Sequence, residues 1–210
     1  MAPPPRAAGV AATLVVLVGL SAGAWALGGD RGDGGDPRSL RGGTVYGDPR
    51  LPKSAAQPPS LTEPTGRVSV RLSGSVAKIA NADVLGDADL LVLKAWVRSI
   101  SVVVTHDAEV TRGVWLFTPK AEQASKGLMN AIELLYGRVG YRPIPTRHPE
   151  VVALRFTPGA GESGPITYRA HYASSRGVVR VEAFGPDGTT ADLAFLELLD
   201  AQLRTLPPIS

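Results

Sequence analysis

The chain has 210 residues, enough for one domain with a substantial hydrophobic core and little more. Its 22 Lys and Arg residues against 19 Asp and Glu residues give a net charge of +3, and the basic residues are scattered along the chain. We therefore expect no nucleic-acid partner, because such proteins gather their basic side chains on one surface. The lack of cysteine excludes disulfide bonds, thiolate metal ligands and a cysteine nucleophile.

Residues 1–27 form the expected membrane segment. The stretch 7–27 carries no charged side chain, and Arg6 precedes it. About 20 apolar residues span the hydrocarbon core of a bilayer as a helix, which predicts a single-pass anchor with Trp25 near the interface. The alternative is a cleaved signal peptide, because Ala22-Gly23-Ala24 has the small-x-small pattern of a cleavage site.

The expected location is the cell membrane, with the C-terminal domain outside the cytoplasm. Arg31, Arg38 and Arg41 follow the apolar stretch and slightly oppose this orientation by charge alone. A long domain after one N-terminal apolar segment is nevertheless the layout of an exported protein. Cleavage of the segment would instead give a secreted protein.

Residues 28–64 are rich in Gly, Pro, Asp and Arg and contain few large apolar side chains. Such a composition buries too little surface to offset the entropy lost on ordering. We therefore predict a disordered linker over 28–64, followed by one folded domain over 65–210.

The first half of the domain is predicted to contain strands followed by a helix. Val68, Val70 and Leu72 alternate with polar residues, and the stretches 100–105 and 113–117 are β-rich. The region 83–99 fits a helix or a strand, and we favour a strand over 91–97. Thr118 and Pro119 are expected to begin a helix whose apolar face includes Leu128, Ile132 and Leu135.

The second half is predicted to follow the same plan. Residues 151–156, 166–172 and 178–184 are typical of strands, and in the last of these Val179 and Val181 alternate with Arg180 and Glu182. Thr190 is expected to cap a final helix, which Pro207 and Pro208 stop. Its predicted buried stripe consists of five leucines: Leu193, Leu196, Leu199, Leu203 and Leu206.

The two halves also share short sequence matches. Arg112-Gly113-Val114 recurs as Arg176-Gly177-Val178, 64 residues later, and Glu133 matches Glu197 at the same interval. This suggests an internal strand-strand-helix duplication, although turns and helix stripes look alike for physical reasons in any case. The predicted fold is α+β, with a mainly antiparallel sheet and two long helices on one face.

This layout of membrane segment, Pro/Gly-rich linker and two-lobed domain ending in a strand and a leucine-rich helix resembles a known family. It is similar to the extracellular sensor domains of actinobacterial membrane serine/threonine kinases and related small lipoproteins. The resemblance covers the layout of residues 68–206 and rests on no diagnostic motif. This chain lacks the family's disulfide cysteines, lipobox and kinase domain, so no functional residue is carried over. The resemblance implies a ligand- or partner-sensing module at the outer face of the membrane.

The candidate site residues are few. His106 and His171 occupy nearly equivalent places in the two halves, so they are candidates to face each other across a ligand. The alternative is that both are solvated at strand ends. No histidine has the spacing of a metal site, so we expect no metal and no cofactor.

We therefore expect a non-catalytic extracytoplasmic module that binds a small ligand, a wall polymer or a protein partner. A structural or assembly protein of the cell envelope is the main alternative. A hydrolase using Ser174 or Ser175 is the weaker one, because no nucleophile-elbow sequence surrounds them.

Overall fold

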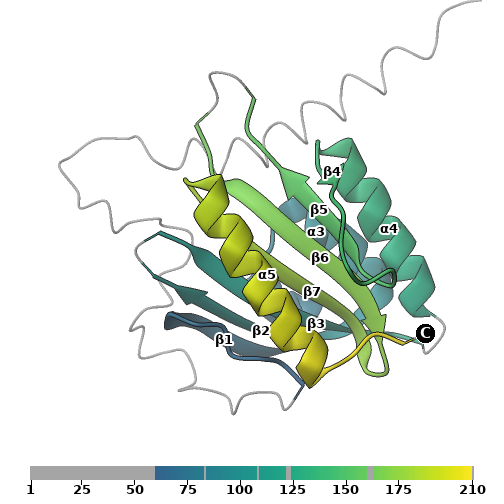
Figure 1. Ribbon diagram of the computed structural model, residues 1–210. Helices are drawn as coiled ribbons and strands as arrows, with labels where there is room; N and C mark the ends of the chain where they lie inside the picture. Colours follow the sequence, from purple (N-terminus) through teal and green to yellow (C-terminus); the bar gives the residue numbers. More distant parts are fainter. Residues whose placement is uncertain (1–59, 83, 108, 122–123, 160–162, 210) are drawn as a thin grey trace, which may run out of the picture.

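The computed structural model describes residues 60–82, 84–107, 109–121, 124–159 and 163–209. Within these ranges a seven-stranded sheet has the strand order β1-β2-β3-β7-β6-β5-β4 (Figure 1), and every paired strand is antiparallel. The strands are β1 (Arg67–Ser75), β2 (Val97–His106), β3 (Thr111–Pro119), β4 (Arg142–Pro143), β5 (Val152–Phe156), β6 (Ile166–Ser174) and β7 (Gly177–Gly185). The helices are α2 (Val76–Ala80), α3 (Asp87–Trp96), α4 (Ala124–Arg138) and α5 (Gly188–Thr205). The predicted α+β class with an antiparallel sheet is confirmed.

The two halves of the domain join through β3 and β7. These strands pair from Thr111 with Phe184 to Phe117 with Val178. The halves therefore meet within one continuous sheet rather than across a cleft.

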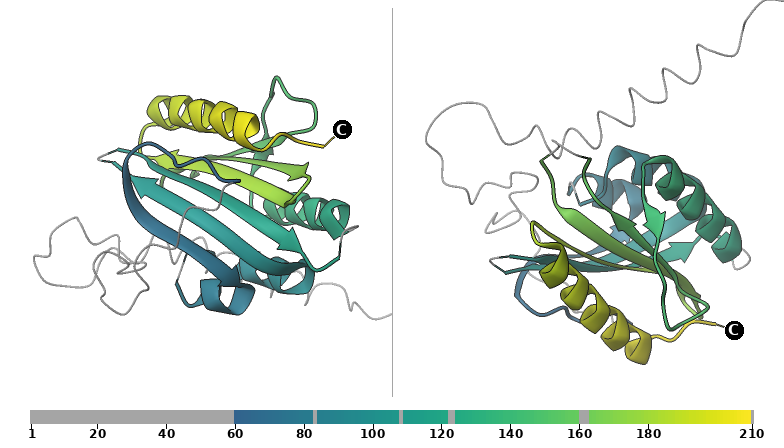
Figure 2. Two further views of the ribbon diagram at one scale, coloured as in Figure 1. Left: turned by 90° about the horizontal axis from the view of Figure 1, so that it is seen from below. Right: turned by 45° about the horizontal axis from the view of Figure 1, so that its top comes forward.

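Helices cover both faces of the sheet (Figure 2). One core contains Phe195, Leu199 and Leu203 of α5, and the other contains Leu128 and Ile132 of α4 together with side chains of α2 and α3. The prediction that both long helices lie on one face is therefore wrong. The reason lies in strand β3, next to the middle of the sheet, where consecutive residues 113–117 are all buried, so each face of the sheet needs its own cover.

The order strand-strand-helix does occur twice, as β2-β3-α4 and β6-β7-α5. Because β3 and β7 are antiparallel, a two-fold axis that exchanges them must be perpendicular to the sheet. Rotation about such an axis leaves each helix on its own face of the sheet. It cannot superpose α4 on α5, which lie on opposite faces. The halves share an order of elements but have opposite hands, which argues against a rigid duplication.

Two helix starts differ from the predictions. Thr118 and Pro119 end β3, and α4 begins at Ala124. In α5 the N-cap is Asp187 rather than Thr190, because the Asp187 carboxylate accepts hydrogen bonds from the backbone N–H groups of Thr189 (3.3 Å) and Thr190 (2.8 Å). The N-cap of the final helix therefore lies three residues earlier than predicted.

The region that we expected to contain a strand over 91–97 forms helix α3. Asp87 and Asp89 lie in its first turn and Lys94 in its last, as the helix dipole favours. Leu93 is buried in the core on the α4 side of the sheet, whereas Leu91 is exposed. The helix therefore has apolar side chains on both its buried and its exposed face, which explains why the sequence pattern of this region was ambiguous.

The buried face of α5 also differs from the predicted leucine stripe. Leu199, Leu203 and Leu206 are buried, but Leu193 is 59% exposed and Leu196 is 47% exposed. Smaller side chains take the inward positions near the start of the helix, because Ala191 and Ala194 are buried there with Phe195 and Leu198. The buried face of α5 therefore does not include Leu193 and Leu196.

The folded part begins before residue 65. Leu61, in the predicted linker, is 2% exposed and belongs to the core on the α5 side. We call residues 60–65 the N-terminal strap; it runs past the C-terminal end of α5 before entering β1 (Figure 1). The strap and the C-terminal segment lie at the same end of the sheet, since Ser60 accepts a hydrogen bond from Arg176 and Pro208 bridges to Ser174.

The predicted anchor at 7–27 and residues 28–59 of the predicted linker lie outside the described residues. Among the helices described here, none is both long enough and apolar enough to cross a bilayer.

Candidate functional site

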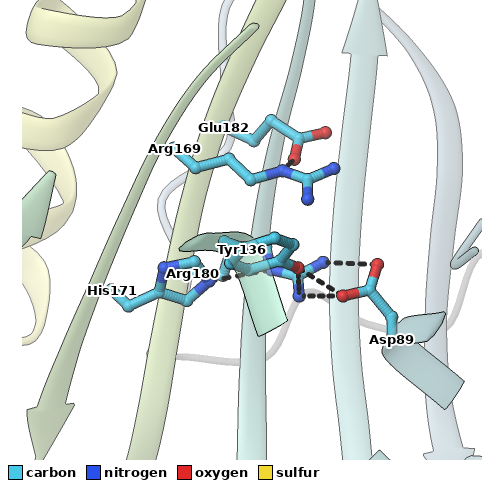
Figure 3. Close-up of polar contacts among 6 residues, drawn as sticks. All are labelled: Asp89, Tyr136, Arg169, His171, Arg180 and Glu182. Carbon is cyan, nitrogen blue, oxygen red and sulfur yellow. Dashed lines mark hydrogen bonds and ion pairs between the residues drawn. The ribbon is translucent and has the colours of Figure 1, made fainter. Parts of the chain in front are cut away.

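Six polar side chains meet on the α4 side of the sheet (Figure 3). We call them the central polar cluster: Asp89, Tyr136, Arg169, His171, Arg180 and Glu182. Strands β6 and β7 supply the two arginines, His171 and Glu182, while α3 supplies Asp89 and α4 supplies Tyr136. The cluster thus links α3 and α4 to strands β6 and β7.

Arg180 is the centre of the cluster and is 1% exposed. Its Nη2 lies 2.8 Å from Asp89 Oδ1, and its Nε donates to His171 Nε2 at 3.2 Å. Tyr136 Oη accepts from Arg180 Nη2 and donates to Asp89 Oδ1. The guanidinium also lies over the Phe117 ring, 5.0 Å from its centroid. Arg180 therefore has polar partners from three elements.

The second arginine forms a parallel pair in the same layer. Arg169 Nε donates to Glu182 Oε2, and the two residues are cross-strand partners on β6 and β7. The Arg169 guanidinium lies 4.7 Å from the centroid of the Tyr136 ring and 5.0 Å from that of Tyr141. Two cations and two carboxylates thus balance the buried charge of the cluster.

The electrostatics hold the two sides of the central ion pair in their charged forms. Burial acts to raise the pKa of Asp89, but the charges of Arg180 and Arg169 and the hydrogen bonds from Arg180 and Tyr136 lower it to about 2. Burial raises the pKa of Tyr136 well above its usual value, so its phenol stays protonated and can donate to Asp89. The pair is fixed as carboxylate and guanidinium.

His171 is held neutral. Burial lowers its pKa well below the usual value, and the charges of Arg180 and Arg169 lower it further. Since Nε2 accepts from Arg180, the proton of the neutral ring is on Nδ1, which is buried and has no hydrogen-bond partner. Trp115 Nε1 is also buried and unpartnered. Trp115, Arg180 and His171 are in direct cross-strand register on β3, β7 and β6.

The cluster can brace the fold but offers little to a ligand. Asp89, Glu182, His171 and Arg180 are all buried beneath α3 and α4. Its charges are already paired within the cluster, and breaking a buried pair is costly. Within the described ranges, no group of three or more His, Asp or Glu side chains is placed to hold a metal.

The two candidate histidines are not brought together. His171 is in the middle of the sheet, whereas His106 ends β2 and its Nδ1 lies 2.9 Å from Thr111 Oγ1. Strands β3 and β7 separate β2 from β6. His106 lies at a strand end, and His171 belongs to the central polar cluster.

A shallow groove lies beside the C-terminal end of α5. His148, Asp200 and Arg204 line it with Leu203, Pro207 and Pro208. His148 Nε2 lies 3.8 Å from Asp200 Oδ1. This lining contains no serine, threonine or cysteine, so the His–Asp pair has no nucleophile to activate there.

A second set of contacts binds the N-terminal strap. Gln202 of α5 is fully buried; its Oε1 accepts from the Thr62 N–H (2.8 Å) and its Nε2 donates to the Ser60 carbonyl (3.0 Å). Sequence reasoning missed Gln202 because it treated 60–64 as linker. Arg180 was missed because its alternation with Val179 and Val181 is equally typical of a solvated face.

Comparisons of the chain with protein-family models, with curated proteins and with solved structures found no match.

Proposed function

We propose that this chain is a non-catalytic extracytoplasmic module that binds a protein partner and is tethered to the membrane through residues 7–27. The tether is proposed from the uncharged apolar stretch of the sequence. The choice of a protein over a small ligand follows from the arrangement of the sheet. The central polar cluster is buried and internally paired, and the two halves join directly through β3 and β7.

The observation that carries the proposal is the position of β1 at the end of the strand order. This strand has nine residues, and among the described strands it pairs only with β2. The outer edge of such a strand presents backbone N–H and C=O groups that another polypeptide can pair with. A wall polymer or a small ligand has no matching row of backbone groups.

The opposite edge of the sheet contrasts with β1. Strand β4 has two residues, Arg142 and Pro143, and proline has no N–H to donate. At the β1 edge, the Ser73 carbonyl already accepts a hydrogen bond from Lys78 Nζ of α2 (3.3 Å). We therefore expect an added strand to pair mainly with the part of β1 that ends at Ser73.

Site-specific photo-crosslinking in intact cells tests the binding surface. A photoreactive residue at Ser73, which is exposed at the β1 edge, should give a discrete adduct with one protein. The matched control is the same residue at Arg142, exposed at the opposite edge, which should give none. Equal adducts from both positions, or none from Ser73, would argue against strand addition at β1.

Topology is tested separately. A reporter active only outside the cytoplasm, fused after Pro64, should give signal, whereas a cytoplasmic reporter at the same point should be silent. The reverse result would place the domain inside the cytoplasm and remove the extracytoplasmic part of the proposal.

A structural or assembly role in the envelope is favoured by a different observation. Four leucines point outward from the helices: Leu91 (74% exposed), Leu134 (63%), Leu193 and Leu196. Leu193 and Leu196 are three residues apart on α5 and so are neighbours on its outer surface. If assembly is the role, substituting both with Ser should reduce the size of the complex on a native gel while the fold persists.

A further inference from the structure

The N-terminal strap is bound as a peptide would be. One buried side chain, Gln202, pairs with both backbone groups that flank Leu61: it accepts from the Thr62 N–H and donates to the Ser60 carbonyl. A side-chain amide thereby mimics one residue of a neighbouring strand. This part of the recognition reads backbone and does not depend on the side chains of Ser60 and Thr62.

The side chain between these two hydrogen bonds gives the recognition its specificity. Leu61 is buried in the same core as Leu203 and Leu206 of the α5 region. Outside that core, Arg176 Nη1 donates to Ser60 Oγ (2.7 Å), and Thr62 Oγ1 lies 2.7 Å from Thr205 Oγ1. The bound sequence is therefore a segment with one leucine between two small hydroxyl residues.

The strap is set off from the sheet that follows it. Gly66 separates it from β1 and has a φ of +107°, a turn conformation that glycine adopts readily. Besides its contacts with α5 and Arg176, the strap is held by an ion pair between Glu63 and Arg71 of β1 and by a hydrogen bond from Thr105 Oγ1 to the Thr65 carbonyl (2.7 Å). The strand pairing of β1 begins at Arg67, after the strap. Segments outside the strand ladder open more often than central strands do.

We propose that the groove formed by Gln202, Arg176 and the core around Leu61 is a peptide-binding site, occupied by the chain's own strap. A partner segment that carries a leucine between small hydroxyl residues competes for it. This inference goes beyond the β1 edge and does not depend on it. Because the strap is attached to the domain, it competes at an effective concentration on the order of millimolar, and a partner binds well only when the strap is weakened.

A peptide titration tests the proposal. The probe is a fluorescent synthetic peptide of residues 58–65, Pro-Pro-Ser-Leu-Thr-Glu-Pro-Thr, added to the full-length chain and followed by anisotropy. Leu61→Ala in the chain weakens its own strap, so this variant should bind the peptide at least about ten-fold more tightly than the unaltered chain. The control peptide has alanine in place of its leucine and should bind neither chain.

The binding residues are tested in the Leu61→Ala background. Adding Gln202→Leu should abolish peptide binding. Because Gln202 is fully buried, Arg176→Ala is the second variant, since Arg176 is exposed and its loss should weaken binding about ten-fold without unfolding the domain. Circular dichroism checks that each variant is folded.

Hydrogen exchange gives an independent measurement on the unaltered chain. The Thr62 amide, bonded to Gln202, should exchange at least about 100-fold faster than the amide of Val181 in the central strand. Equal protection of the two amides would make the strap a permanent part of the core. That result would overturn the proposal, as would failure of the Leu61→Ala chain to bind the peptide or its equal binding of the alanine control. None of these three results bears on crosslinking at Ser73, so the two proposals fail separately.

Discussion

The Nε–H of Arg180 donates to Nε2 of His171 across 3.2 Å, and burial together with the charges of Arg180 and Arg169 lowers the pKa of His171 so that the imidazole stays neutral. Protonation of Nε2 would remove the only acceptor that this hydrogen bond uses and would place a third positive charge beside Arg180 and Arg169. The central polar cluster therefore requires Asp89 to be ionised and His171 to be neutral. Because protonating either group would disrupt the cluster, the stability of the fold depends on pH.

Stability should fall as the pH is lowered. The pKa of His171 is lower in the folded protein than its usual 6.5, so below about pH 6.5 the unfolded chain takes up a proton that the folded chain does not. The pKa of Asp89 falls from 3.8 to about 2 on folding, so its contribution is present above pH 3.8 and is lost as the pH falls toward 2. Urea unfolding measured between pH 8 and pH 3 checks this dependence.

The control for the histidine effect is His171→Gln, whose side-chain oxygen still accepts from Arg180 but does not titrate. The slope of the unfolding free energy between pH 6.5 and 5 should be smaller in this variant by up to about 1.4 kcal/mol per pH unit. An unchanged slope would show that His171 titrates normally in the folded protein.

Removing one member of the central ion pair should be more harmful than removing both. Asp89→Leu leaves the buried Arg180 without its carboxylate and should cost about 3–5 kcal/mol of unfolding free energy. Asp89→Leu combined with Arg180→Met removes the unpaired charge and should recover part of that loss. Guanidinium unfolding of both singles and the double variant gives the coupling energy. Additive losses would contradict a coupled pair.

Two leucines of α5 provide a matched test of the helix face. Leu199 is 2% exposed and lies in the core, whereas Leu196 is 47% exposed on the outer surface. Leu199→Ala should cost about 2–5 kcal/mol, and Leu196→Ala less than about 0.5 kcal/mol. Thermal unfolding of the two variants distinguishes this buried face from the one that the leucine stripe predicts. Equal losses of stability would mean that Leu196 and Leu199 are both buried, as the stripe predicts.

The domain boundary can be tested with two fragments. A fragment of residues 60–210 should be more stable than one of residues 65–210 by about 1.5–3 kcal/mol, because it keeps the buried side chain of Leu61. Denaturation should not depend on reductant, since the chain has no cysteine, nor on chelator, since no group of His, Asp and Glu side chains among the described residues is placed to hold a metal. Identical midpoints for the two fragments would place the boundary after the strap.

The strands were predictable because alternation and β-branching are local signals. Residues 100–105 and 178–184 fall within β2 and β7, and Val68, Val70 and Leu72 all lie in β1. Helix α3 was not predicted, because Leu90, Leu91 and Leu93 fit either period. Its choice depends on tertiary contacts, including the hydrogen bond between Tyr136 and Asp89.

The candidate site was harder to predict, because its residues come from four elements that are distant in sequence. Arg180 and Glu182 alternate with valines on β7, as they would on a half-solvated strand. They are buried because α4 covers that face, and nothing local to β7 specifies where α4 packs. The available signal was the combination of a strand with one polar face, β7, and an apolar helix for each face of the sheet, α4 and α5. That combination predicts that the polar face is buried and its charges are paired.

The shared location of the two ends of the domain has a consequence for how it presents its surface. Ser60 is bound by Arg176, and Pro208 bridges to Ser174, so the chain enters and leaves beside the same β6–β7 turn. The turn between β2 and β3 is at the opposite end, where the Glu109 carbonyl lies close to Gly185 at the end of β7. A domain tethered through its N-terminal end would direct the β2–β3 turn away from the tether. An affinity tag or fluorescent protein added after Ser210 would then lie beside the tether and leave the β2–β3 turn accessible.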